Sequence, residues 1–277
     1  MRPFRVMQMN FNNGARGRES MSEEGHLPNV EVRERTVIVT LDRPLRANRL
    51  ESDDVMALYS LWSGLASDRS VNAIVLTARG KHFSSGFDLN EVVDEVDPTT
   101  SVAAFPKMID ALENLPQVTI CALNGGVYGG ATDLALACDF RFGVPSCEMF
   151  IPAARLGVQY FSGGLRRYVS RVGLNNAKRL LLLAEKFDAD EMLSIGYLDR
   201  VVPSEQLMAL ALATAQQVDA LAPLAVTGMK LALNAFAAGN VDEGAARAQE
   251  AAVFQSMDFK EGVAAWRQKR KPVFKGC

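Results

Sequence analysis

The chain has 277 residues, of which 48% are hydrophobic and 22% charged, with a formal net charge of -2. This length can bury a sizeable core, and the composition is that of an ordinary globular protein. The balance of charges lacks the basic excess that nucleic-acid binding requires, so we expect no nucleic-acid partner.

Cysteine and histidine usage narrows the chemistry further. The four cysteines form no CxxC pair and lie mostly in apolar runs, which favours reduced, buried thiols. There are only two histidines, His26 and His82. A His-rich metal site is therefore excluded, no metal is expected, and neither histidine lies beside a nucleophile motif.

The chain has no run of eighteen apolar residues and no apolar segment typical of a secretory signal near its N-terminus. We therefore expect a cytoplasmic protein without a membrane partner. Residues 1–25 begin with a stretch rich in Asn, Arg and Gly without periodicity, and we expect them to be a disordered extension. A core over 26–202 and a helical region over 203–277 complete the predicted organisation.

Strands and helices alternate through the predicted core. The stretch "TVIVTLDRP" predicts a strand ending at Pro44, and "LESDDVMALYSLWSGLAS" has helical apolar spacing. The continuous apolar runs "VNAIVLTARG" and "VTICALNG" are typical of strands buried on both faces. Between them, "FPKMIDALENLP" predicts a helix that stops before Pro116. This alternation favours an α/β fold with a largely parallel sheet.

From Pro203 onward the pattern is helical throughout. Two apolar stripes at helical spacing follow each other. They consist of Leu207, Leu210, Ala211, Val218 and Leu221, and of Val226, Met229, Leu233 and Phe236. We expect this region to cover the core or to join subunits.

The stretch "VYGGATDLALACD" places Gly129 and Gly130 before a short apolar helix whose first turn contains Asp133. Glycine allows another group to approach the backbone, and a helix start leaves N–H groups without intrahelical partners. An oxygen-rich ligand could bind there. The alternative is a tight strand-to-helix turn with an acid that suits the helix dipole.

Two loops together resemble the crotonase family, also called the enoyl-CoA hydratase/isomerase superfamily. They are "GKHFSSGFDLNEV" and "ALNGGVYGGATDLALACDFRF". Three further segments, "VTLDRPLRANRL", "FDADEMLSIGYLDRVVP" and "EGVAAWRQKRKPVFKG", are similar to family segments in the same order. The resemblance implies a superhelix of repeated strand-strand-helix units and C-terminal helices that assemble homotrimers or homohexamers.

The resemblance also implies that the main-chain N–H groups of Phe87 and Gly130 form an oxyanion hole for the carbonyl of an acyl-CoA thioester. No cofactor is expected, because coenzyme A enters as part of the substrate. Matching the family further places residues around the thioester and its CoA. These are Arg46, Ala47, Ser85, Phe87, Asp88, Leu89, Gly129, Gly130, Phe274 and Lys275.

The family's hydratases use two glutamates, because adding water across a double bond needs one proton to leave and another to arrive. The first position is Asp133, an acid that some dienoyl-CoA isomerases of the family also carry. The second position is Ala153, which cannot transfer a proton. A further acid of those isomerases falls near Phe161, so it is missing too.

Tyr160 offers a different route. Its stretch "LGVQY" is similar to "LGVPY" of methylmalonyl-CoA decarboxylases, where a tyrosine lies near the leaving carboxylate. Decarboxylation needs an oxyanion hole but no second acid. The alternative is a packed tyrosine with a bonded hydroxyl.

The leading interpretation is an acyl-CoA-processing enzyme of the hydratase/isomerase type with Asp133 and Tyr160 as catalytic candidates. A decarboxylase or an acyl-CoA hydrolase on the same scaffold is the alternative. From another class of protein, a non-catalytic acyl-CoA-binding protein also fits the loss of the second acid.

Overall fold

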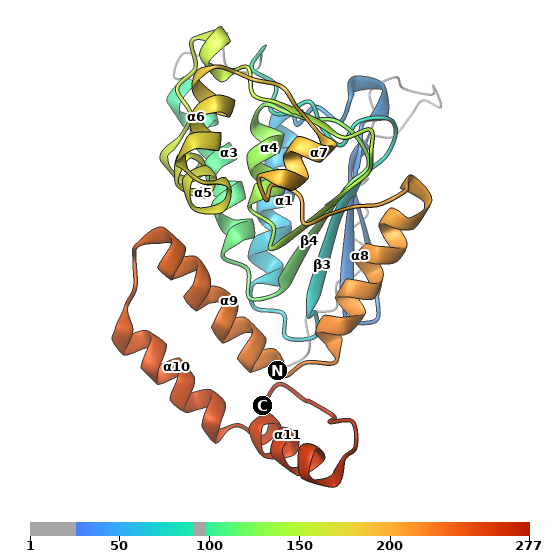
Figure 1. The fold of residues 1–277 in the computed structure, drawn as a ribbon, viewed down its shortest axis with the longest axis vertical. Coiled ribbons are helices and arrows are strands. Elements are labelled where there is room, and N and C mark those ends of the chain that lie inside the picture. The colour runs from blue at the N-terminus through green and yellow to red at the C-terminus, as the bar shows by residue number, and fades with distance from the viewer. Residues whose placement is uncertain (1–25, 91–97) are drawn as a thin grey trace, which may run out of the picture.

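The computed structural model describes residues 26–90 and 98–277 (Figure 1). The predicted disorder of residues 1–25 lies outside this part of the chain. Within it, a six-stranded sheet has the order β1-β2-β3-β4-β6-β9, and a second sheet has the order β5-β7-β8. The strands are β1 (His26–Arg33), β2 (Thr36–Asp42), β3 (Ala73–Ala78), β4 (Val118–Leu123), β5 (Val127–Tyr128), β6 (Phe140–Gly143), β7 (Glu148–Phe150), β8 (Phe187–Asp188) and β9 (Arg200–Val201).

The large sheet is parallel except for β1, which pairs antiparallel with β2 at the edge. β3 and β4 are buried almost throughout, as their continuous apolar runs predict. β1 was not predicted from the sequence; half of its residues are polar, and most of its side chains are exposed. Charged side chains on such an edge oppose pairing with another chain.

Helices cover both faces of the large sheet (Figure 1). α8 packs against β3 and β4 on one face, whereas α1, α3 and α4 lie on the other. The helices are α1 (Ser52–Leu65), α3 (Pro98–Glu113), α4 (Gly130–Leu136), α5 (Ser162–Val172), α6 (Leu174–Leu182), α7 (Ala189–Ser194), α8 (Ser204–Asp219), α9 (Pro223–Ala238), α10 (Glu243–Gln255) and α11 (Met257–Gln268). The alternation predicted for the core is therefore confirmed.

The predicted helix before Pro116 is α3, and its apolar stripe is buried. Phe105, Met108, Ile109 and Leu112 are each at most 4% exposed. Met108 and Ile109 have no exposed surface at all. This stripe holds α3 against α1 and the core.

The two apolar stripes after Pro203 have different surroundings. In α8, Leu207, Ala211 and Val218 are buried, whereas Leu221 lies beyond the helix and is 50% exposed. In α9, three members of the predicted stripe, Met229, Leu233 and Phe236, are more than half exposed. That face of α9 does not pack on the core of its own chain.

Val226, the remaining member of the stripe, packs against the core, and polar contacts also attach α9 to it. Lys230 is buried, and its Nζ donates to the main-chain oxygen of Gln117 at 2.6 Å and pairs with Asp139 at 2.7 Å. Asn234 donates to the main-chain oxygen of Glu113 at 3.0 Å.

None of the described helices alone is long and apolar enough to span a membrane; α8 and α9 meet the criterion only as a pair, across a 112° bend.

Candidate active site

The carboxyl ends of β3 and β4 lead into the two glycine-bearing loops. Because neighbouring parallel strands end at the same edge of a sheet, both loops meet there. The point of contact is Gly86, where an added Cβ would lie 2.8 Å from the main-chain oxygen of Tyr128 and 3.0 Å from the nitrogen of Gly130. Gly86 also has a φ of +94°, so a side chain is excluded on two grounds.

Buried polar contacts hold the first loop in place. Asn48 is 1% exposed, and its side-chain amide donates to the main-chain oxygens of Arg79 at 2.7 Å and His82 at 2.8 Å. Ser84 Oγ in turn donates to the main-chain oxygen of Asn48 at 2.6 Å. The asparagine of "RPLRANRL" therefore braces the loop that contains Phe87.

The two main-chain N–H groups predicted as oxyanion donors have no partner in residues 26–90 and 98–277. The main-chain groups on either side of Phe87 pair with Leu50, which donates to Gly86 at 2.9 Å and accepts from Asp88 at 2.9 Å. Gly129 donates its own N–H to Phe150 at 2.9 Å, while Gly130 begins α4. The N–H groups of Phe87 and Gly130 are thus available to a ligand.

Asp133 is brought close to this point by the first turn of α4, but it is fully buried. Its two oxygens accept from Nε of Arg167 at 2.9 Å and from Nη2 at 2.7 Å. Burial raises the pKa of Asp133 above its ordinary value, although the hydrogen bonds and charge of Arg167 oppose this effect. The paired arginine uses two of the four acceptor sites of the carboxylate, so further acceptor positions remain.

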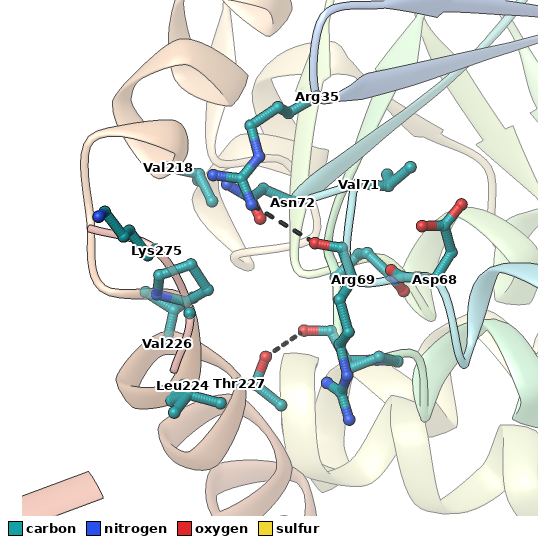
Figure 2. Close-up of a pocket in the computed structure, with 14 residues that line it drawn as sticks. Arg35, Asp68, Arg69, Val71, Asn72, Val218, Leu224, Val226, Thr227 and Lys275 are labelled. Carbon is teal, nitrogen blue, oxygen red and sulfur yellow. Dashed lines mark hydrogen bonds between the residues drawn. The ribbon is translucent and has the colours of Figure 1, made fainter. Parts of the chain in front are cut away.

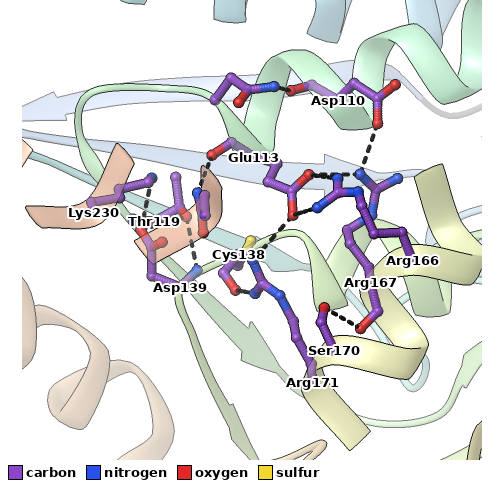
Figure 3. A network of polar contacts seen from close by, with 12 residues as sticks. Asp110, Glu113, Thr119, Cys138, Asp139, Arg166, Arg167, Ser170, Arg171 and Lys230 are labelled. Atoms are coloured by element: carbon purple, nitrogen blue, oxygen red, sulfur yellow. Dashed lines mark hydrogen bonds and ion pairs between the residues drawn. The ribbon is translucent and has the colours of Figure 1, made fainter. Parts of the chain in front are cut away.

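Arg167 is the centre of a buried network of charges (Figure 3). Its Nη1 contacts Asp110 at 2.7 Å and Glu113 at 2.9 Å, in addition to the pair with Asp133. Burial lowers the pKa of Arg167, but the three carboxylates outweigh burial and raise the pKa above its ordinary value. The guanidinium therefore stays charged and fixes Asp133 in one orientation.

Glu113 links this network to two more arginines on α5. Arg166 and Arg171 both form ion pairs with its carboxylate (Figure 3). Burial raises the pKa of Glu113, but the hydrogen bond from Arg166 and the charges of the three arginines outweigh burial, so the pKa lies below its ordinary value. Glu113 is therefore ionised at neutral pH.

Apart from Asp133, no residue of this network was predicted from the sequence. The stretch "GGLRRYV" could have indicated it. Two adjacent arginines there belong to a helix that packs against the core, so one of them is turned inward. Arg167 has no exposed surface, and an arginine buried to this extent requires carboxylate partners.

Tyr160 lies over the start of α4. Its hydroxyl is 3.5 Å from the main-chain oxygen of Gly129, at the limit of a hydrogen bond, and its ring stacks on Phe161 with centroids 4.9 Å apart. Burial, followed by the negative charge of Asp133, raises the pKa of Tyr160 well above its ordinary value. The hydroxyl therefore remains protonated and can act only as a neutral donor or acceptor.

Ala153 begins a short 3-10 helix (Ala153–Leu156) and is partly buried against the core. The side chain contributes only a methyl group where the resemblance places a second acid. Phe161 likewise contributes a ring in place of a further acid, and its ring packs edge-on against Phe105 with centroids 6.3 Å apart.

Most of the predicted CoA-contacting residues gather around the first loop. Ser85 donates its N–H to the main-chain oxygen of Ala47 at 2.8 Å, next to Arg46. Arg46 pairs with Glu51 at 3.1 Å, and 40% of its side chain is exposed, so a phosphate could compete for it. Leu89 is exposed at the end of this loop.

Asp88 was also predicted to lie near the CoA, and it does lie on this loop. Its carboxylate pairs with Arg49 at 3.0 Å. A carboxylate held in this way stabilises the loop, and its role towards CoA remains a prediction.

Phe274 and Lys275 lie elsewhere in the chain. Lys275 lines a small cavity of about 50 Å³ with Arg35 and Asn72, next to the amino ends of β3 and β4 (Figure 2). Its main-chain N–H donates to Asp258 at 2.7 Å. Because the two loops lie at the carboxyl ends of these strands, the structure does not bring Lys275 to the Phe87 site of the same chain, and its predicted role requires a second copy.

Asp139 lies between α4 and β6, and it is bonded to Thr119 of β4. Its Oδ2 accepts from the main-chain N–H of Thr119 at 2.7 Å and from the Thr119 hydroxyl at 3.0 Å. The main-chain N–H of Asp139 donates back to Thr119 at 2.9 Å.

Comparison with known proteins agrees with this architecture. The family model described as enoyl-CoA hydratase/isomerase matches residues 31–277. The chain is 30% identical to 2,3-dehydroadipyl-CoA hydratase from Escherichia coli over 88% of this chain and 96% of that protein. It is 31% identical to a short-chain-enoyl-CoA hydratase from Clostridium acetobutylicum over 86% of this chain and 93% of that protein.

Solved structures give the same result. The enoyl-CoA hydratase from Bacillus anthracis superimposes with a TM-score of 0.83 at 28% identity, over 91% of this chain and all of that one. An enoyl-CoA hydratase/carnithine racemase from Magnetospirillum magneticum gives a TM-score of 0.85 at 28% identity, over 91% and 96% of the two chains. The fold implied by the loop motifs is confirmed, and the chain belongs to the enoyl-CoA hydratase/isomerase family of the crotonase superfamily.

Proposed function

We propose that this enzyme binds an acyl-CoA thioester with its carbonyl oxygen between the N–H groups of Phe87 and Gly130. The observation that carries the proposal is that two loops converge at Gly86 and leave both N–H groups without a partner among the described residues. Such donors stabilise the negative charge that develops on the oxygen as the thioester becomes an enolate. Each donor contributes about 2.7–4 kcal/mol of transition-state stabilisation.

Asp133 is the proposed proton-transfer group. Arg167 fixes the orientation of its carboxylate and opposes the rise in its pKa that burial causes. The raised pKa makes Asp133 a stronger base than an exposed aspartate. A shift of a double bond needs one base that removes a proton and returns it at another carbon. Hydration needs a second group, and Ala153 cannot supply it, so the residues favour isomerisation over hydration.

Decarboxylation is the second candidate, and the position of Tyr160 supports it. Its protonated hydroxyl lies over Gly129 in aromatic surroundings, where a substrate carboxylate would lose its hydration. Loss of carbon dioxide leaves the enolate in the same oxyanion hole. Hydrolysis of the thioester and binding without chemistry are the remaining alternatives.

The proposed chemistry requires no cofactor, because the CoA moiety enters with the substrate. Incubation with crotonyl-CoA, 2,3-dehydroadipyl-CoA, a 3-enoyl-CoA and methylmalonyl-CoA, followed by mass spectrometry, separates the reactions. Hydration adds the mass of water, decarboxylation removes that of carbon dioxide, and hydrolysis releases free CoA. Isomerisation leaves the mass unchanged, so the conjugated enoyl thioester is followed by its ultraviolet absorbance. Binding without conversion of any ester supports the non-catalytic alternative.

We further propose that the chain assembles into a homotrimer or homohexamer. The exposed face of α9, with Met229, Leu233 and Phe236, is apolar and is not covered by its own chain. A neighbouring copy would bury this face. It would also allow Lys275 to reach the CoA of another subunit, where its charge suits a phosphate.

A further inference from the structure

A continuous layer of aromatic rings lies beside the proposed oxyanion donors. Neighbouring rings in the layer have centroids 4.9–6.3 Å apart. Its members, in order of contact, are Phe87, Phe105, Phe161, Tyr160 and Tyr168. Phe87, whose N–H is the first proposed donor, is itself a member of the layer, so an acyl group bound at the donors begins next to these rings.

Phe105 is the member closest to the second donor. An added Cβ on Gly130 would lie 2.6 Å from Cε1 and 2.7 Å from Cζ of Phe105, well inside van der Waals contact. Its ring centroid is also 5.2 Å from that of Phe87, whose N–H is the first donor. The ring of Phe105 therefore lies against both loops, next to the two proposed donors.

The ring has little freedom to move away. Phe105 is 4% exposed, and it belongs to the buried stripe of α3 that includes Met108 and Ile109. Phe161 packs against it from the other side. A longer acyl chain would have to displace close-packed aromatic carbon, and overpacking of this kind costs about 1–3 kcal/mol.

We propose that Phe105 limits the substrate of this enzyme to short acyl chains. The proposal rests on the proposed acyl-CoA site and adds the class of acyl group that this site accepts. Shortening the side chain at position 105 removes aromatic carbon beside Gly130, while the two N–H donors and the proposed CoA contacts on the first loop remain. Discrimination by one methylene in a filled apolar pocket amounts to roughly 10–200-fold.

The test measures the binding of butyryl-CoA and decanoyl-CoA by calorimetry, because saturated esters bind whatever the reaction is. The wild-type protein is expected to bind butyryl-CoA at least about 10-fold more tightly, and Phe105→Ala to reduce this ratio through tighter binding of decanoyl-CoA. Phe140→Ala is the matched control, since Phe140 is partly exposed on β6 and is no part of the aromatic layer. It should leave the ratio unchanged.

Phe105→Leu is measured alongside, because it keeps more of the buried volume if the alanine variant fails to fold. An equal affinity for both esters in the wild-type protein, or an unchanged ratio in a folded Phe105 variant, would overturn the proposal for Phe105. If the wild-type protein binds neither ester, the proposed acyl-CoA site itself is wrong.

Discussion

Replacing Arg167 with methionine tests the buried charge network most sharply. The substitution keeps a long apolar side chain but removes the guanidinium that contacts Asp133, Glu113 and Asp110. Glu113 retains Arg166 and Arg171, and Asp110 is half exposed, so both remain stabilised. Asp133 has no exposed surface and loses the partner of both its oxygens.

The expected cost at neutral pH follows from this difference. Leaving one buried charge without its partner costs about 3–5 kcal/mol, a large part of the roughly 5–15 kcal/mol by which a folded protein is stable. Arg166→Met is the matched control on the same helix. Arg166 is partly exposed, and Glu113 is its one ion-pair partner within residues 26–90 and 98–277, so its loss should cost at most about 1 kcal/mol.

The pH dependence gives a second signature. In Arg167→Met, the pKa of Asp133 rises further above its unfolded value, so the folded state binds the proton more tightly and gains stability as the pH falls. The loss of stability should therefore be smaller at pH 5 than at pH 7.5, by up to about 3 kcal/mol. Glu113 has a lowered pKa, so the stability that its charge contributes is lost only at still lower pH. Its titration therefore does not obscure the effect of Asp133 between pH 5 and pH 7.5.

Urea unfolding of both variants and the wild-type protein at pH 5 and pH 7.5, at one protein concentration, measures these differences. An Arg167→Met variant that is no less stable than Arg166→Met at pH 7.5 would refute the reasoning. A destabilisation that grows as the pH falls would refute it too.

Further predictions concern catalysis and assembly. Asp133→Asn should lower kcat at least roughly 100-fold while acyl-CoA affinity changes little; a full-rate variant would move the chemistry to Tyr160. Ala153→Glu should raise the hydration of crotonyl-CoA, as followed by absorbance, by restoring a second acid, and no gain in a folded variant would count against the two-acid argument. Sedimentation at micromolar concentration should show a trimer or hexamer, whereas a stable monomer would contradict the proposed burial of α9.

The sequence predicts the core of this fold because its signals are local. The apolar runs of β3 and β4 specify buried strands, and the stripe from Phe105 to Leu112 specifies the face of α3 that packs inward. The glycine-bearing loops can also be recognised in the sequence. At Gly86 only glycine tolerates both the positive φ and the close approach of the second loop.

The rest depends on contacts between distant segments. Nothing local pairs Arg167 with Asp133, 34 residues earlier, or places Phe105 on Gly130. The aspartate therefore looks in sequence like a free first-turn acid, whereas in the structure both its oxygens accept hydrogen bonds from Arg167. The apolar stripe of α9 can be recognised in the sequence, but the sequence does not show which side of the helix meets the core. In the structure, the side with Lys230 meets the core, through contacts with Gln117 and Asp139.

The most direct test of the oxyanion hole is the infrared spectrum of bound butyryl-CoA with a ¹³C-labelled thioester carbonyl. Two hydrogen bonds should lower the carbonyl stretching frequency relative to the free ester in water. Incorporating glycolic acid in place of Gly130 turns the preceding amide into an ester and removes one N–H without adding a side chain that would strike Phe105. The account predicts that this variant loses part of the shift and about 2.7–4 kcal/mol of transition-state stabilisation, roughly 10²–10³ in kcat. An unshifted carbonyl in the wild-type protein, or an ester variant with the full shift and full rate, would contradict it.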